Sequence, residues 1–96
     1  MSEPGEACRI DVWLWRARFC KTRSLAARMV AEGQVRILRG DVLIPLDKPS
    51  RMVRPGDGLL LSFPDRRAAV KIEALGTRRG PAPEARALYA SADDPG

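Results

Sequence analysis

The chain has 96 residues, of which 45% are hydrophobic and 30% charged, and its formal net charge is +5. This length allows one small domain with a single core, and the composition is typical of a folded globular protein. No apolar stretch approaches the roughly 20 residues needed to cross a bilayer, and the acidic start MSEPGEACR lacks the apolar run of a secretory signal. We therefore expect a cytoplasmic protein with no membrane segment and a polyanionic partner.

The positive charge is unevenly distributed along the chain. Residues 9 to 58 hold eleven Lys or Arg side chains against five Asp or Glu, whereas the rest of the chain holds six against seven. Arginine, whose planar guanidinium suits bidentate phosphate contacts, greatly outnumbers lysine. The surplus indicates that residues 9 to 58 contain the surface for the polyanion.

Catalytic and metal-binding chemistry has little support in this sequence. Histidine, the commonest general base and metal ligand, is absent, and the acidic residues of the basic segment form no close pair. Cys8 and Cys20 form no CxxC pair, and a helix over residues 10 to 19 would put their sulfur atoms roughly 15 Å apart, too far for a disulfide. We expect two free thiols, no catalytic residue, no metal site and no cofactor, and hence no enzyme.

Two short helices are predicted at the start of the domain, after a flexible leader over residues 1 to 8. Apolar residues at positions 10, 13, 14 and 17 have the spacing of an amphipathic helix, which Phe19 closes. The segment TRSLAARMVAEG predicts a second helix with Thr22 as its N-cap and Gly33 at its left-handed end. Its buried stripe is expected to hold Leu25, Ala26, Met29 and Val30. Because only Cys20 and Lys21 separate the helices, they should pack as a tight pair.

After Gly33 the pattern predicts strands. Alternating apolar residues on both sides of Arg39-Gly40 indicate a hairpin with Gly40 at positive φ, and residues 45 to 55, with three prolines, indicate an extended loop. The turn over residues 55 to 58 precedes a strand over 59 to 63, and residues 70 to 74 alternate as a half-exposed strand. Pro83 opens a short C-terminal helix docked by Leu88 and Tyr89, and residues 91 to 96 are expected to be disordered.

A basic corner lies at the expected start of the second helix. Lys21 and Arg23 flank Thr22 there, and Ser24 adds a second hydroxyl. A helix N-terminus offers unpaired N–H groups and the positive end of the dipole, so a phosphate could collect two cations, a hydroxyl and backbone amides. Solvated bases on a helix face are about equally compatible with the spacing. Basic residues at this end oppose the dipole at a cost of roughly a few tenths of a kcal/mol, which modestly favours a functional role.

The two tryptophans are interpreted as packing residues. Trp13 lies in the apolar stripe of the first helix and is predicted to be buried. Trp15 is rotated about 200° from it and is expected to be partly exposed. Base stacking by either ring is the less favoured alternative.

The segment RIDVWLWRARFCKTRSLAARMVAEGQVRI resembles the alpha-L RNA-binding motif named for ribosomal protein S-four. The shared pattern is Arg-apolar-Asp opening a helix, Lys-Thr-Arg-Ser at the second helix, and Gly-x-Val entering a hairpin, followed by KPS and PGD. Together with GTRRGPAPEARALY, the stretch is similar to the heat-shock protein fifteen family. That resemblance covers about residues 9 to 90 and implies a small ribosome-associated protein that binds free large subunits carrying a stalled nascent chain on tRNA.

The resemblance also implies which residues face the RNA. They are Arg9, Arg18, Lys21, Thr22, Arg23, Ser24, Arg36, Lys48 and Ser50. Three departures from the family pattern concern these contacts: Val12 replaces a usual Lys, Leu38-Arg39-Gly40 replaces a usual Asn-Gly hairpin, and the loop to Lys48 is several residues longer. The long basic tail of some relatives is also absent from this sequence.

These observations together predict an α+β fold with two packed N-terminal helices, a small antiparallel sheet and a short C-terminal helix. We expect the RNA-binding domain with its following strands to span residues 9 to 76 and a C-terminal extension to span residues 77 to 90. The predicted function is non-catalytic binding of structured ribosomal RNA by a monomer. Two alternatives stay open, namely a detached RNA-binding appendage of an RNA-modifying enzyme such as a pseudouridine synthase, and a general RNA-binding or weak DNA-binding module.

Overall fold

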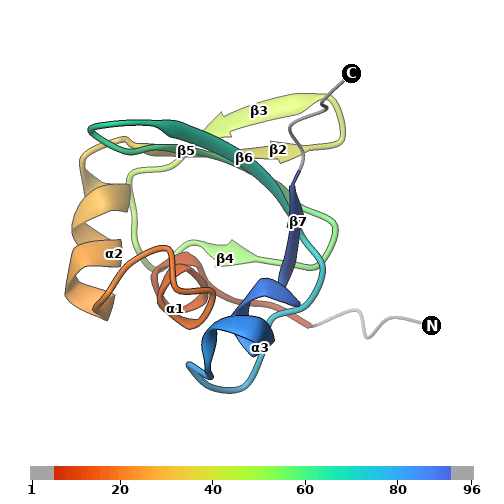
Figure 1. Cartoon of the computed structure of the whole chain (residues 1–96). Coiled ribbons are helices and arrows are strands. Elements are labelled where there is room, and N and C mark those ends of the chain that lie inside the picture. Colours follow the sequence, from red (N-terminus) through yellow and green to blue (C-terminus); the bar gives the residue numbers. More distant parts are fainter. Residues whose placement is uncertain (1–5, 92–96) are drawn as a thin grey trace.

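In the computed structural model, which describes residues 6–91, a curved antiparallel sheet covers two helices (Figure 1). The elements in chain order are β1 (Cys8–Arg9), α1 (Ile10–Arg16), α2 (Arg23–Ala31), β2 (Val35–Arg39), β3 (Val42–Pro45), β4 (Met52–Val53), β5 (Gly58–Ser62), β6 (Arg67–Ile72), α3 (Ala82–Arg86) and β7 (Tyr89–Ser91). The five-stranded sheet has the order β3-β2-β5-β6-β7, with every neighbouring pair antiparallel. The predicted α+β class is confirmed.

The core lies between the inner face of the sheet and the two N-terminal helices. Strand alternation produces the sheet's half of it, because β2 and β5 bury every second side chain. The largest fully buried side chains are Trp13, Ile10, Leu14, Ile37, Leu59, Leu61, Ile72, Val30, Val35 and Val53. As predicted, Trp13 is buried, and Trp15 is partly exposed.

Helix α2 begins and ends where the sequence indicates. The Thr22 hydroxyl oxygen accepts the Leu25 amide hydrogen at 3.0 Å, which is the predicted N-cap. At the other end Gly33 has φ +77°. The Gly33 amide donates to the Val30 carbonyl and the Gln34 amide to the Met29 carbonyl, which closes a Schellman motif. The prediction that Leu25 belongs to the buried stripe of α2 is wrong, because its side chain is 48% exposed. Leu25 lies about 100° around the helix from the buried Ala26 and therefore outside the stripe.

The first helix is shorter than predicted. It ends at Arg16, and Arg18 has φ +64°, the one left-handed residue other than glycine within residues 6–91. A left-handed residue cannot continue a right-handed helix, so Phe19 lies after the helix rather than inside it. Its partly buried ring nevertheless packs against the core, with a centroid 4.7 Å from that of Tyr89.

Three short strands, β1, β4 and β7, were not predicted from the sequence. Cys8, assigned to the leader, forms β1 with Arg9 and pairs with β4, which lies inside the predicted 45–55 loop. Ser91, which was predicted to belong to the disordered tail, is the last residue of β7 and pairs with Val70 of β6. Strands of two or three residues show no periodicity from which to predict them. The remaining leader and tail predictions, for residues 1–5 and 92–96, lie outside the described residues.

The end of α1 is fastened to residues 74–80, which connect β6 to α3. Four side chains donate to backbone carbonyls across this junction: Trp13 Nε1 to Ala74 (2.9 Å), Arg16 Nη1 to Gly76 (2.9 Å), Arg18 Nε to Gly80 (2.7 Å) and Arg79 Nε to Trp15 (3.1 Å). The C-terminal extension therefore packs against the first helix and is part of the same domain.

Candidate nucleic-acid interface

The loop that carries Lys48 and Ser50 is fixed to the start of α1. The Ile10 amide donates to the Arg51 carbonyl at 2.8 Å, and the Asp11 amide donates to the Pro49 carbonyl at 3.3 Å. These bonds satisfy two of the N–H groups that a helix start leaves without partners. The pairing of Arg9 with Met52 extends the contact. Predicted site residues almost 40 positions apart are thus held together.

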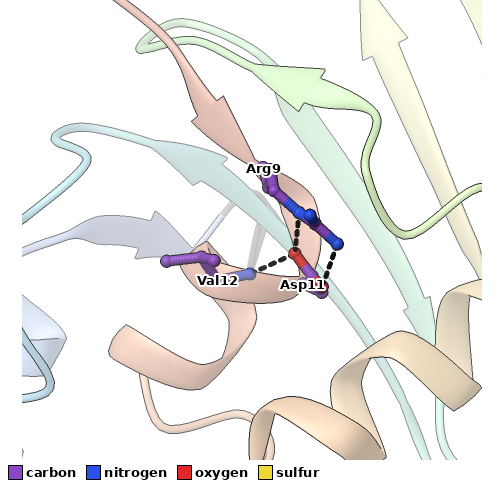
Figure 2. Close-up of polar contacts among 3 residues, drawn as sticks. All are labelled: Arg9, Asp11 and Val12. Carbon is purple, nitrogen blue, oxygen red and sulfur yellow. Dashed lines mark hydrogen bonds and ion pairs between the residues drawn. The ribbon is translucent and has the colours of Figure 1, made fainter.

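Arg9 is held in place by Asp11. Its Nε and Nη2 atoms donate to the two carboxylate oxygens at 3.0 and 2.9 Å, and Oδ1 also accepts the Val12 amide hydrogen at 2.8 Å (Figure 2). The Asp11 side chain is only 5% exposed, whereas that of Arg9 is 47% exposed. A guanidinium fixed in this bidentate pair keeps its outer edge toward solvent with little rotamer entropy left to lose on binding an anion.

Exposed polar groups continue along this loop. Lys48, Ser50 and Arg51 line a depression of about 500 Å³, whose lining also includes the acidic residue Asp47. Arg51 was absent from the predicted site, although its position directly after the KPS motif, in a proline-containing loop, was a signal that could have identified it. The surface formed by Arg9, Lys48, Ser50 and Arg51 is called the loop surface below.

The second group of predicted site residues is the run from Lys21 to Ser24 at the start of α2, called the corner below. All four side chains are exposed. The oxygen of Thr22 serves as the N-cap acceptor, which leaves its hydroxyl hydrogen available to donate to an anion. Within residues 6–91 neither Lys21 nor Arg23 has a carboxylate within 4.0 Å. The corner therefore presents two uncompensated cations at a helix N-terminus.

The two remaining predicted residues occupy different places. Arg36 is exposed on the outer face of β2, opposite Pro45 and Leu60, and lines a shallow depression of about 390 Å³. Arg18 donates to the Gly80 carbonyl and so has a structural contact that the sequence did not indicate. Among the described residues no hydrogen bond or ion pair joins the corner to the loop surface. The structure therefore brings together part of the predicted site and leaves the rest as separate patches.

A partly buried ion pair fixes the turn after β4. Arg39 donates from Nε and Nη2 to the Asp57 carboxylate at 3.0 and 2.8 Å, and the Arg54 amide donates at 2.9 Å. Burial alone would raise the pKa of Asp57, but the hydrogen bonds from Arg39 and Arg54 outweigh it and hold that pKa below its ordinary value. Asp57, the acidic residue of the PGD motif, thus stabilises the turn after β4.

Two kinds of feature are absent from residues 6–91. No group of three or more His, Cys, Asp or Glu side chains lies where it could hold a metal ion, and no helix in this range is long and apolar enough to cross a membrane. Cys8 and Cys20 are free thiols, as predicted. Burial raises the pKa of both, which disfavours the nucleophilic thiolate.

Comparison with known proteins places this geometry in a family. The S4 domain family matches residues 8–37, which contain α1, α2 and the corner. The solved trimeric structure of Vibrio cholerae Heat Shock Protein 15 superposes with a TM-score of 0.77 at 39% identity, over 92% of this chain and 84% of that one. The chain belongs to the heat shock protein 15 family. The resemblance stated from the sequence is confirmed.

Curated relatives agree with this assignment. The chain is 41% identical over 81 residues to the heat shock protein 15 homolog of Haemophilus influenzae and 38% identical over 87 residues to heat shock protein 15 of Escherichia coli K12. These alignments cover 84% and 91% of this chain but 58% and 62% of the relatives, so the chain spans about three fifths of their length. The S4 domain and the family support RNA binding without catalysis.

Proposed function

We propose that this chain binds structured ribosomal RNA in the cytoplasm, on the free large ribosomal subunit carrying peptidyl-tRNA, and acts in translation rescue during stress. The observation that carries the proposal is the attachment of the Lys48–Arg51 loop to the start of α1, beside an Arg9 held by Asp11. This attachment gathers cations from distant parts of the chain onto one preorganised surface, beside the segment of residues 8–37 that the S4 domain family matches.

The mechanism is recognition of RNA shape. Arg9, Lys48 and the corner cations contact phosphates, while the hydroxyls of Thr22 and Ser50 donate to phosphate or ribose oxygens. The buried Trp13 supplies packing and takes no part in base stacking. Such a surface binds folded RNA with little dependence on base identity, since phosphate contacts carry no sequence information.

A comparison of three ligands tests this proposal. Affinities for isolated large subunits, an RNA hairpin and duplex DNA of equal length are measured at one ionic strength. The proposal expects the large subunit to bind most tightly and the duplex DNA most weakly. Equal affinity for all three would instead favour a general nucleic-acid module. Lys21→Ala with Arg23→Ala should weaken binding to different RNA sequences alike, and a sequence-selective loss contradicts the phosphate assignment.

The oligomeric state is a separate part of the proposal. The sequence predicts a monomer, whereas the Vibrio cholerae relative is described as trimeric. We retain the monomer as the RNA-binding form, because the corner and the loop surface each come from one chain. Sedimentation velocity at micromolar concentration, with and without RNA, should show one mass for the free protein. A trimer that persists on dilution overturns the monomer.

A further inference from the structure

A second basic pocket lies where the end of α1, the β5–β6 turn and α3 meet. Its volume is about 240 Å³, and three arginines from these three segments line it: Arg18, Arg66 and Arg86. Phe19 and Tyr89 form its aromatic wall, and alanines fill the rest of the lining. No acidic side chain is part of the lining, so three positive charges face one small space.

These three cations lack the partners that the fold gives to other arginines. Four arginines within residues 6–91 have a carboxylate within 4.0 Å, but Arg18, Arg66 and Arg86 do not. Two of the three are nevertheless held in position. Arg18 donates to the Gly80 carbonyl at 2.7 Å, and the Arg66 guanidinium lies 4.6 Å from the centroid of the Phe63 ring. Converging cations without a counter-charge raise the local concentration of anions.

We propose that this pocket binds a phosphodiester of the RNA strand, as a contact additional to the corner and the loop surface. The proposal rests on the proposed function. Guanidinium groups provide planar, bidentate donors to phosphate oxygens, and the aromatic wall can accept an adjacent sugar or base face. Arg18 precedes Lys21 by three residues, so their Cα atoms are at most about 11 Å apart, and one strand can cross both sites.

On this proposal the C-terminal extension contributes to RNA binding. Arg86 lies on α3, and Arg66 lies in the β5–β6 turn, both outside the segment that the S4 domain matches. The bonds that fasten residues 74–80 to α1 bring α3 to the end of the first helix. The extension would therefore enlarge the RNA-binding surface of the domain beyond its two helices.

The test is the salt dependence of binding to large-subunit ribosomal RNA. Each lost phosphate contact lowers the magnitude of the log–log slope by about 0.7 to 0.9, so Arg66→Gln with Arg86→Gln should lower it by about 1.4 to 1.8 and weaken binding about tenfold. The matched control, Arg67→Gln with Lys71→Gln, removes the same charge from neighbouring exposed positions and should change the slope by less than half as much. Equal losses from both pairs, or no loss from the pocket pair, overturn the proposal.

A second measurement identifies the source of the phosphate. NMR signals of the arginine Nε–Hε groups are followed while the wild-type chain is titrated with a uridine hexanucleotide or with inorganic phosphate. The proposal expects the hexanucleotide to shift the Arg66 and Arg86 signals at concentrations where inorganic phosphate does not. Equal shifts with both indicate a site for free phosphate and contradict RNA as the ligand.

The outcomes also separate this proposal from the proposed function. If Lys21→Ala with Arg23→Ala weakens RNA binding while the pocket variant equals the wild type, only the pocket proposal fails. If the wild type shows no salt-dependent binding to ribosomal RNA, the proposed function fails, and the pocket proposal fails with it.

Discussion

Replacing Asp57 with alanine should lower the free energy of unfolding by about 2–3 kcal/mol. The carboxylate accepts three hydrogen bonds, two from Arg39 and one from the Arg54 amide, and its side chain is 6% exposed. Breaking a buried pair usually costs about 3–5 kcal/mol, but the Arg39 side chain is 32% exposed, so water can solvate part of the abandoned guanidinium. The reduced figure corresponds to a Tm lower by about 10–20 °C for a domain of this size.

Urea unfolding followed by tryptophan fluorescence measures this loss. The matched control is Glu32→Gln, which removes an exposed ion pair with Arg28 at 3.2 Å and should cost less than about 0.5 kcal/mol. A free energy of unfolding of Asp57→Ala within about 0.5 kcal/mol of the wild-type value would show that the Arg39–Asp57 pair does not stabilise the fold.

The same pair predicts a pH dependence. Because the pKa of Asp57 is lowered in the folded state, its contribution to stability is present above the ordinary carboxyl pKa of about 3.9 and is lost as the pH falls through the lower folded value. The stability difference between wild type and Asp57→Asn should therefore be constant near neutral pH and shrink below about pH 4. A difference that stays constant through acid unfolding contradicts this assignment.

Three further predictions concern a turn, a guanidinium and the thiols. Gly33→Ala should cost about 1–2 kcal/mol in urea unfolding, since alanine is strained at φ +77° even though its Cβ meets no neighbour; an unchanged stability contradicts this. Asp11→Asn should weaken RNA binding in a filter assay although it adds one positive charge, because Arg9 loses its bidentate partner; tighter binding contradicts a positioning role for Asp11. Cys8 and Cys20 should react with iodoacetamide at pH 8 more slowly than a free cysteine, since burial raises the pKa of both; equal rates exclude this protection.

The elements set by local chemistry could be predicted from the sequence. Thr22 caps α2, Gly33 takes the left-handed position at its end, and Gly40 has φ +63° in the predicted hairpin. Each of these positions is determined by a side-chain oxygen or by the lack of a Cβ within a few residues of the chain. Composition and short-range pattern are therefore sufficient for them.

The missed features depend on contacts between distant segments. Strands β1 and β4 are two residues each and exist because the chain before α1 meets the loop some 40 residues later. The contact of Arg18 with Gly80 joins positions 62 apart, and its left-handed backbone has no local signal in an arginine. Helix N-terminus chemistry indicated only Lys21 to Ser24, and the family resemblance implied the other RNA-facing residues. All of them stay predictions, because spacing alone does not separate functional from solvated bases.

The salt dependence of RNA binding by the wild-type chain tests the central claim most directly. Affinity for large-subunit ribosomal RNA is measured from about 50 to 200 mM salt, a range in which phosphate contacts release bound counterions. Four to six phosphate contacts predict a log–log slope of roughly −3 to −5, and Lys21→Ala with Arg23→Ala should bring it closer to zero by about 1.4 to 1.8. A slope near zero, or the same slope in the wild type and this variant, would contradict the account.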